Sequence, residues 1–526
     1  MPKVLISDAL SETAVNIFRE RGLEVVFEPA LGKDPAALLK AVADIDGLAI
    51  RSATKVTPEV LDAAPNLKVV GRAGIGVDNV HIPTATAKGV VVMNTPYGNA
   101  ITTAEHAIAM MFSLARQIPQ ANESTHAGKW EKSRFIGTEL FGKTLGIIGC
   151  GNIGANVAER AIGCKMHVVA YDPFLSDARA VELGVEKADL DTLLARADII
   201  TLHTPLTDQT RNILSKEAIS KTKQGVMIIN CARGGLVDED ALKDALEAGH
   251  VAGAALDVYA EEPAKAHPLF GNPRVVATPH LGASTREAQE NVAIQVAEQM
   301  SEYLLRGAVT NALNMPSISA EEAPRLKPFI ELAEYLGAFG GQLTETSIKA
   351  IEVVYSGGVA KLNTKPLTAS AIAGVLRPML GDVNIVNAPV IAKERGVAIA
   401  ETYRDTVENF ESIIRLRIVT ERNDRVVAGA LFGAGPRVVE VNGVEMEAAF
   451  APNMLYVTND DKPGFIGALG QTLGGASVNI ATFNLGRSAP GENAISLLAV
   501  DHGVSDAVLQ QVRALPHVNQ AKALSF

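Results

Sequence analysis

The chain has 526 residues, a length that exceeds what one hydrophobic core can hold, so three or four domains are expected. Apolar residues make up 47% and charged residues 20%, a composition that excludes a largely disordered chain. Its net charge of −11 argues against a nucleic-acid or anionic-membrane partner. The three cysteines have no paired spacing, so we expect neither disulfides nor a metal site. The first residues do not resemble a signal peptide and no apolar run is long enough for a membrane span, so a cytoplasmic protein is expected.

The first hundred residues alternate short β-branched runs with helical periods. A helix is expected after Ser11, its predicted N-cap, ending near Gly22. Strands are expected over 3–7, 23–27, 47–52, 67–74 and 89–94. Alternating strands and helices indicate a parallel, doubly wound sheet. We expect residues 1–98, closed by a returning helix within 284–314, to form a flavodoxin-like first domain.

A second alternating block follows a long helical stretch that begins near residue 100. Its strands are expected over 143–149, 166–172, 197–203, 226–232, 251–258 and 275–280. This pattern predicts a Rossmann domain over 99–283. The proline-rich segment 316–328 is interpreted as a linker. Beyond it we expect an α+β intervening domain over 315–451 and, over 452–526, a β-α-β-β-α-β module with a ferredoxin-like fold.

A glycine-rich turn opens the second block. Gly149, Gly151 and Gly154 form a GxGxxG that directly follows an apolar strand and begins a helix. The first glycine allows a tight turn, the second lets backbone approach a pyrophosphate, and the third lets helix pack on strand. The next strand ends in Asp172, where a carboxylate binds the ribose hydroxyls and repels the extra phosphate of NADP. The cofactor predicted from this unit is NAD.

Three polar residues follow later strands of the same block, where open parallel sheets place ligands. Arg233 can hold a carboxylate through paired hydrogen bonds, and His280 can exchange a proton with a hydroxyl group. Glu262 can orient that imidazole and raise its pKa. Singly, each would be read as a structural or surface residue. Together, behind a dinucleotide-binding turn, they predict hydride transfer to or from a 2-hydroxy acid.

The segments that hold these residues, CARGGLVDE, ALDVYAEEP and TPHLGAST, resemble the signatures of the D-isomer-specific 2-hydroxyacid dehydrogenases. That resemblance implies that Arg233, Glu262 and His280 are the catalytic residues. It also implies that the cofactor is lined by further residues, namely Asn152, Ile153, Thr204, Cys231, Ala232, Asp257, Gly282 and Ala283.

Two N-terminal segments, RSATKVT and VGRAGIGVDN, are most similar to the phosphoglycerate dehydrogenases of that family. The resemblance implies NAD-dependent oxidation of a phosphorylated 2-hydroxy acid as the first step of L-serine biosynthesis. It assigns the substrate's anionic groups to Arg51, Ser52 and Arg72, with backbone at Ala73 to Gly76 that includes Gly74 and Ile75. Weaker candidates, Lys132 and Arg134, would reach the site from a neighbouring subunit of a homodimer or homotetramer. The role of Tyr97 stays open.

The last module resembles an ACT domain, a fold that often binds amino acids between two copies. Its DDKPG turn at a helix start could receive a carboxylate, with Asp461 taking the amino group and Asn479 facing it from the next strand. The resemblance implies an L-serine effector. The alternative is an oligomerisation module without a ligand.

Two rival functions also stay open at this point. One is the same chemistry on lactate, glycerate, glyoxylate or a bulkier 2-keto acid. The other is an NAD-sensing binding protein with little activity.

Overall fold

The first sheet has five parallel strands in the order β2-β1-β3-β4-β5, the flavodoxin-like order. We describe it from a computed structural model, which describes residues 1–406, 409–433 and 435–526. The strands are β1 (Lys3–Ile6), β2 (Glu24–Phe27), β3 (Gly47–Ile50), β4 (Val69–Arg72) and β5 (Val91–Met93). The helices around it are α1 (Glu12–Glu20), α2 (Pro35–Ala41), α3 (Pro58–Asp62), α4 (Ile82–Ala87) and the returning α12 (Arg286–Arg306).

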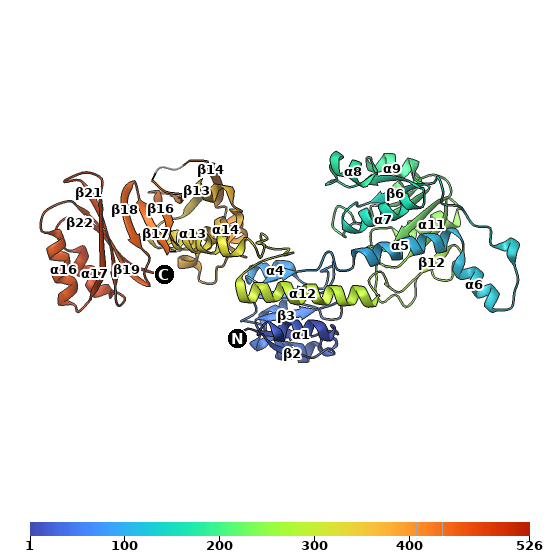
Figure 1. The fold of residues 1–526 in the computed structure, drawn as a ribbon, viewed down its shortest axis with the longest axis horizontal. Coiled ribbons are helices and arrows are strands. Elements are labelled where there is room, and N and C mark those ends of the chain that lie inside the picture. Colours follow the sequence, from blue (N-terminus) through green and yellow to red (C-terminus); the bar gives the residue numbers. More distant parts are fainter. Residues whose placement is uncertain (407–408, 434) are drawn as a thin grey trace.

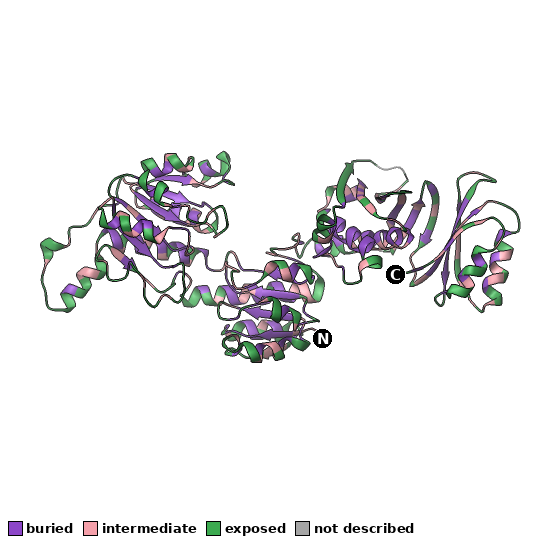
Figure 2. Cartoon of the chain, turned by 180° about the vertical axis from the view of Figure 1, so that it is seen from behind, coloured by how far each residue is buried: buried purple, intermediate pink, exposed green. Residues whose placement is uncertain are grey.

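The strands of this sheet are short and apolar because both faces are covered. Helix α12 packs against α1, β3 and β4, and Gly71 leaves no room for a Cβ against Met300 and Val296. Figure 2 shows the buried residues gathered in the strands and the exposed ones on the outer helix faces. Ser11 takes the predicted N-cap position of α1, but its hydroxyl makes no capping hydrogen bond.

The second sheet has seven parallel strands in the order β12-β11-β10-β9-β6-β7-β8. The strands are β6 (Thr144–Ile148), β7 (His167–Tyr171), β8 (Glu186–Lys187), β9 (Ile199–Leu202), β10 (Val226–Asn230), β11 (Val251–Leu256) and β12 (Val275–Ala277). Its helices are α5 (Ala100–Ala115), α7 (Asn152–Gly163), α8 (Asp177–Leu183), α9 (Leu190–Arg196), α10 (Lys216–Ser220) and α11 (Glu239–Glu247). Strand order reverses between β6 and β9, which is where such sheets bind ligands.

A long arm leaves this second domain between α5 and β6 (Figure 1). It contains α6 (Ile118–His126) and the short 3-10 helix η3 (Lys132–Arg134). Several large apolar side chains of the arm are exposed, among them Trp130 at 88%, Ile136 at 79% and Phe141 at 74%.

The third domain is a mixed six-stranded sheet with two long helices on one face. Its strand order is β14-β13-β15-β16-β17-β18. The strands are β13 (Ile348–Gly357), β14 (Ala398–Arg404), β15 (Ser412–Thr420), β16 (Arg425–Phe432), β17 (Gly435–Val441) and β18 (Val444–Ala449), and the helices are α13 (Ala323–Leu343), α14 (Lys365–Leu380) and α15 (Ala388–Glu394).

The predicted linker over 316–328 is only partly correct, because α13 begins at Ala323. Pro324 stands in the first helical turn, where a missing N–H costs nothing. Pro328 lies inside the helix and removes one hydrogen bond. Burial of Leu326, Leu332 and the rest of the α13 face against the third domain outweighs that loss.

The last 75 residues form a four-stranded antiparallel sheet in the order β20-β21-β19-β22, with the predicted β-α-β-β-α-β sequence of elements. The strands are β19 (Asn453–Asp460), β20 (Ile480–Arg487), β21 (Asn493–Val500) and β22 (Val518–Ser525), with α16 (Phe465–Gly475) and α17 (Asp506–Arg513) on one face. The other face packs on α13, where Phe339 meets Tyr456 and Tyr335 meets Phe526.

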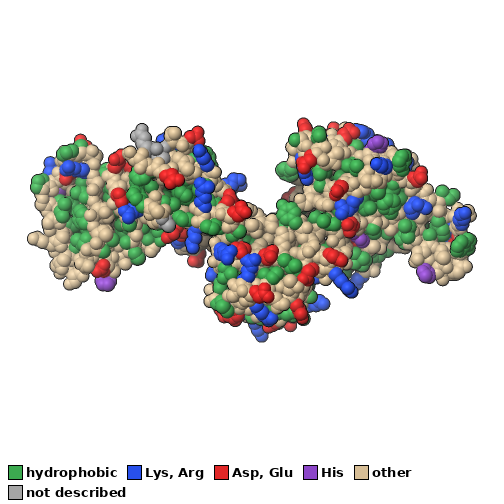
Figure 3. Space-filling model, viewed as in Figure 1, with side chains coloured by type: hydrophobic (Ala, Val, Ile, Leu, Met, Phe, Trp, Pro, Cys, Tyr) green, Lys and Arg blue, Asp and Glu red, His purple; other side chains and the backbone are tan. Residues whose placement is uncertain are grey.

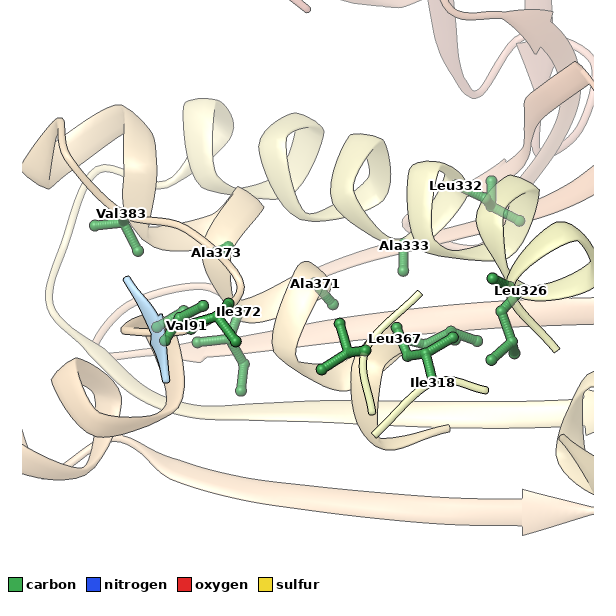
Figure 4. Close-up of a cluster of buried hydrophobic side chains, with 14 of the residues drawn as sticks. Val91, Ile318, Leu326, Leu332, Ala333, Leu367, Ala371, Ile372, Ala373 and Val383 are labelled. Carbon is green, nitrogen blue, oxygen red and sulfur yellow. The ribbon is translucent and has the colours of Figure 1, made fainter. Parts of the chain in front are cut away.

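One buried apolar cluster runs from the first domain through the third to the fourth. In Figure 4, Val91 of β5 lies beside Ile372 and Val383 of the third domain. Over the face shown in Figure 3, acidic and basic side chains are mixed rather than separated into patches of one sign. None of the described helices is long and apolar enough to span a membrane.

Candidate active site

The glycine-rich turn between β6 and α7 has the geometry that a dinucleotide needs. Gly149 has φ 93°, and a Cβ there would lie 2.7 Å from the His203 carbonyl, so only glycine fits. At Gly154 a Cβ would overlap the Gly149 carbonyl, which fixes the close helix–strand packing. Gly151 faces open space within 4 Å, so a ligand can approach its backbone at the start of α7.

Asp172 stands at the end of β7 beside that turn. Its two carboxylate oxygens accept hydrogen bonds of 2.8 Å from the backbone N–H groups of Cys150 and Phe174. Burial raises the pKa of the Cys150 thiol to about 11 and raises that of Cys231 further. Both thiols are therefore neutral lining groups rather than nucleophiles. Turn, helix start and carboxylate together fit an NAD molecule.

The histidine and the glutamate predicted to work together are hydrogen-bonded. His280 lies after β12 with φ 56°, and its Nδ1 is 2.6 Å from Glu262 Oε2. A carboxylate only accepts, so Nδ1–H donates and Nε2 is left for a substrate. The hydrogen bond that His280 donates to Glu262 raises the pKa of His280 against the effect of burial. Burial alone would raise the pKa of Glu262, but hydrogen bonds from His280 and from the Tyr259 N–H lower it.

Arg233 reaches from the second domain into the first. Its Nε donates to Asp78 at 2.9 Å and its Nη1 to the Ala232 carbonyl at 2.7 Å. A Cβ on Gly76 would overlap the Arg233 guanidinium, so the loop after β4 leaves space for it. The positive charge of Arg233 lowers the pKa of His280, an effect smaller than that of Glu262.

The loop after β4 brings a second buried arginine to the same place. Burial, and then the charge of Arg233, lower the pKa of Arg72 to about 10. The Arg72 Nε is buried and has no hydrogen-bond partner among the described residues. Arg51 adds a third positive charge nearby and is held by Asp8 through its backbone N–H at 2.6 Å. Three guanidiniums thus lie near two carboxylates, Asp78 and Asp8, and their net positive charge is suited to an anion.

The loop that carries His280 is organised by Asp257, which is fully buried. Its carboxylate accepts hydrogen bonds from the N–H groups of Leu281 at 2.8 Å and Gly282 at 2.9 Å and from the Thr278 hydroxyl at 2.6 Å. His106 Nε2 lies 3.2 Å from the same carboxylate. Asp257 therefore holds the loop in place, and its role in lining the cofactor stays a prediction.

His106 and Thr278 were missed by sequence reasoning. His106 lies on a helix with no motif around it, and Thr278 lies within TPHLGAST, where only its neighbours were singled out. The one signal that could have pointed to them is the need of a buried Asp257 for partners.

The remaining candidates lie around the glycine-rich turn, the loop after β4 and the loops after other strands. Asn152 donates to the Pro96 carbonyl at 3.4 Å, next to Tyr97, which is 66% exposed. Ile75 accepts from Asn94 at 2.7 Å and Gly74 donates to Thr95 at 2.6 Å, so that loop is held by backbone contacts. Other predicted residues lie in loops that follow strands, namely Ser52, Thr204, Ala232 and Ala283, and Ile153 lies in the first turn of α7. Lys132 and Arg134 lie on the arm.

The predicted effector pair does not meet within one chain, and this part of the expectation is wrong. Asp461 follows β19, whereas Asn479 precedes β20, which runs parallel to β19 two strands away. The two residues therefore lie at opposite ends of the sheet. Asp461 accepts from Arg487 at 3.1 Å and from the Gly491 N–H at 3.0 Å, and Asn479 donates to Asp501 at 2.7 Å.

Two family models match the chain. Residues 108–282 match the D-isomer specific 2-hydroxyacid dehydrogenase, NAD binding domain, and residues 325–442 match the D-3-phosphoglycerate dehydrogenase intervening domain.

Similar proteins cover the whole chain. It is 41% identical over 528 residues to a D-3-phosphoglycerate dehydrogenase of Bacillus subtilis, covering 100% of both chains. It is also 41% identical over 530 residues to one of Methanocaldococcus jannaschii, again over 100% of both.

Solved structures match the first two domains. The TT0316 protein of Thermus thermophilus is 35% identical with a TM-score of 0.55, covering 59% of this chain and 99% of that one. A glyoxylate reductase of Paecilomyes thermophila is 29% identical with a TM-score of 0.55, covering 59% and 98%.

Proposed function

This chain belongs to the D-3-phosphoglycerate dehydrogenase family, and from that membership we propose that its cleft oxidises D-3-phosphoglycerate to 3-phosphohydroxypyruvate, the first step of L-serine biosynthesis. The observation that carries the proposal is the hydrogen-bonded His280–Glu262 pair beside guanidiniums contributed by two domains. Bound NAD⁺ supplies the acceptor for the hydride that leaves C2 of the substrate.

His280 handles the proton of the reaction. With Nδ1–H donated to Glu262, its Nε2 accepts the proton of the C2 hydroxyl as the carbonyl forms. In the reverse direction the imidazolium returns that proton. The negative charge of Glu262 stabilises the imidazolium and fixes the orientation of the ring.

The arginines bind the two ends of the substrate. The guanidinium of Arg233 is suited to the α-carboxylate, which it can grip through two parallel hydrogen bonds. Arg72 and Arg51 are suited to the phosphate. The unpartnered Nε of Arg72 gives it a donor to offer, and a dianion would relieve the mutual repulsion of the three cations.

A substrate panel tests the proposal. NADH formation is followed at alkaline pH, which favours oxidation because the reaction releases a proton, with D-3-phosphoglycerate, D-lactate and D-glycerate. We expect kcat/KM to be highest for the phosphorylated acid and His280→Gln to lower its turnover by about 10²–10⁴-fold. Equal use of D-lactate would favour another member of the enzyme class. Turnover near wild type in the variant would remove His280 from the mechanism.

Three finer features are part of the same proposal. We infer that two copies associate through the arm, because Trp130, Ile136 and Phe141 expose apolar surface there that a partner would cover. We propose the domain limits 1–98 with 284–314, 99–283, 315–451 and 452–526. L-serine is the proposed effector of the last of these. The three free cysteines favour a reducing compartment such as the cytoplasm.

A further inference from the structure

A cavity lies where the first and third domains meet. It is away from the proposed catalytic cleft, the site around Arg233, Glu262 and His280. Its volume is about 440 Å³. Residues just before β3, β4 and β5 form one wall, with Tyr303 of α12, and the loop 384–386 between α14 and α15 forms the other. Those are the amino ends of the strands, whereas Arg72 is the last residue of β4. The cavity and the cleft are therefore at opposite edges of one sheet.

The two walls are joined by specific contacts. Asn384 Nδ2 donates to the Gly89 carbonyl at 3.2 Å, and Asn387 Nδ2 donates to the Ala87 carbonyl at 3.1 Å. Gly89 has φ 71°, and a Cβ there would overlap the Asn384 amide. Beside these contacts, Val91 joins the apolar cluster that includes Val383 (Figure 4). The cavity is thus framed by an ordered domain contact.

Among the charged groups of the lining, ammonium groups outnumber carboxylates. The lining contains two ammonium groups, of Lys68 and Lys88, and one carboxylate, of Asp46. Both Asp46 oxygens are engaged, one by Lys68 Nζ at 2.9 Å and the other by the backbone N–H of Lys3 at 2.8 Å. Lys88 Nζ pairs with Asp62 at 2.7 Å.

Each ammonium has three donors and uses one of them in its ion pair, so both retain donors for a ligand. Asn66 adds an amide and Tyr303 a phenol. An organic cation would meet two ammonium groups here, whereas a carboxylate or phosphate would meet donors only partly satisfied by the protein. The volume, in the range of small-molecule sites, admits an organic acid rather than a single ion.

We propose that this cavity binds a small organic anion that carries a carboxylate or phosphate, and that binding holds the first and third domains together. Both walls contribute groups, so the anion binds best when the walls are in contact. By linkage it then stabilises that contact. This inference does not rest on the reaction proposed for the cleft.

Hydrogen exchange of the full-length protein tests this proposal, with inorganic phosphate as the probe. A parallel experiment with acetate separates phosphate binding from carboxylate binding. We expect phosphate to slow exchange of the backbone amides of 384–388. The variant Lys68→Ala/Lys88→Ala should need at least about tenfold more phosphate for the same protection, because two charge-assisted contacts are lost. Lys40→Ala, an exposed lysine elsewhere in the first domain, should behave as wild type.

A second double variant, Lys68→Arg/Lys88→Arg, keeps both charges and should retain protection, which separates loss of binding from loss of folding. Turnover in the cleft should be unchanged in all these variants, since neither lysine reaches it. The proposal is overturned if phosphate leaves 384–388 unprotected in the wild-type protein, or if the alanine variant is protected equally. A failure of the dehydrogenase assay would leave these exchange results unaffected.

Discussion

The Glu262–His280 hydrogen bond sets the pH dependence of the reaction. Glu262 raises the pKa of His280, so the neutral imidazole that accepts the hydroxyl proton forms only above this raised value. In the wild-type enzyme kcat/KM for oxidation should therefore rise with pH through the pKa of His280. Glu262→Gln removes the negative charge, which should move the rise to lower pH and lower the maximum rate. A pH profile of both proteins checks this, and an unmoved inflection would show that another group titrates.

Arg233 is predicted to need its planar guanidinium and not only its charge. In Arg233→Lys the ammonium cannot form two parallel hydrogen bonds to a carboxylate and loses the 2.9 Å contact from Nε to Asp78. We expect kcat/KM for D-3-phosphoglycerate to fall by at least about tenfold, which corresponds to ~1.4 kcal/mol of transition-state binding. Steady-state kinetics would measure it, with Arg306→Lys, an exposed residue at the end of α12, as the control. Full kcat/KM in the variant would make Arg233 a structural residue.

Single residues of the site were predictable where chemistry demands one residue type at one place. The three glycines, Arg233, Glu262 and His280 follow strands in a fixed order, and parallel strands bring their carboxyl ends to one edge. His106 could not be found in this way, because it lies on α5 and its partner Asp257 is more than a hundred residues away in the chain. The distance between Asp461 and Asn479 was misjudged although the predicted fold implies it. The two strands of a β-α-β unit run parallel, so the end of β19 and the start of β20 lie at opposite ends of the sheet.

At the scale of elements, the connection between β11 and β12 is the part that we expect to be most sensitive. Asp257→Asn replaces by a donating amide either the oxygen that accepts from the Leu281 N–H and the Thr278 hydroxyl or the oxygen that accepts from the Gly282 N–H, so donors would face donors. A lost buried hydrogen bond costs ~1–3 kcal/mol. We expect a lower Tm together with at least about a tenfold lower kcat, because Asp257 holds the backbone of the loop after β12, on which His280 lies.

Thermal unfolding and turnover measure the two effects separately, with the exposed Asp191→Asn as the control. A fall in Tm with wild-type kcat would mean that Asp257 stabilises the fold without positioning His280.

Secondary structure was predictable in the first two domains because buried parallel strands are short apolar runs separated by turn signals. The start of α13 was not, since local propensity at Pro324 and Pro328 indicates a break. The helix forms there because its apolar face is covered by the third domain, a long-range contact that no local pattern contains.

At the scale of the whole molecule, the first, third and fourth sheets are connected through one shared apolar cluster. Tyr335 and Phe339 of α13 pack on Phe526 and Tyr456 of the last domain. The other end of the same apolar cluster reaches Val91 in the first domain. A deletion of 452–526 would expose that face of α13. Regulation is therefore better tested with substitutions than with truncation.

The final prediction concerns L-serine as an inhibitor bound between two copies of the last domain. Asp461 and Asn479 lie at opposite ends of one sheet, so a ligand that contacts both must take them from different chains. Asp461→Ala and Asn479→Ala should each abolish inhibition and leave basal activity unchanged, as expected of two sites linked by a coupling free energy. Calorimetry with the wild-type protein should detect serine binding, and its absence would leave the domain as an association module.

Mixed oligomers of the two variants decide how the site is built. In a pair formed by one Asp461→Ala chain and one Asn479→Ala chain, a site shared between chains occurs once with both residues mutated and once with both intact. Inhibition should therefore return in part. A site contained in one chain would be damaged in every copy, and mixing would restore nothing. Since Arg487 already holds Asp461 at 3.1 Å, the ammonium group of serine must compete with this ion pair, and Arg487→Ala should strengthen serine binding.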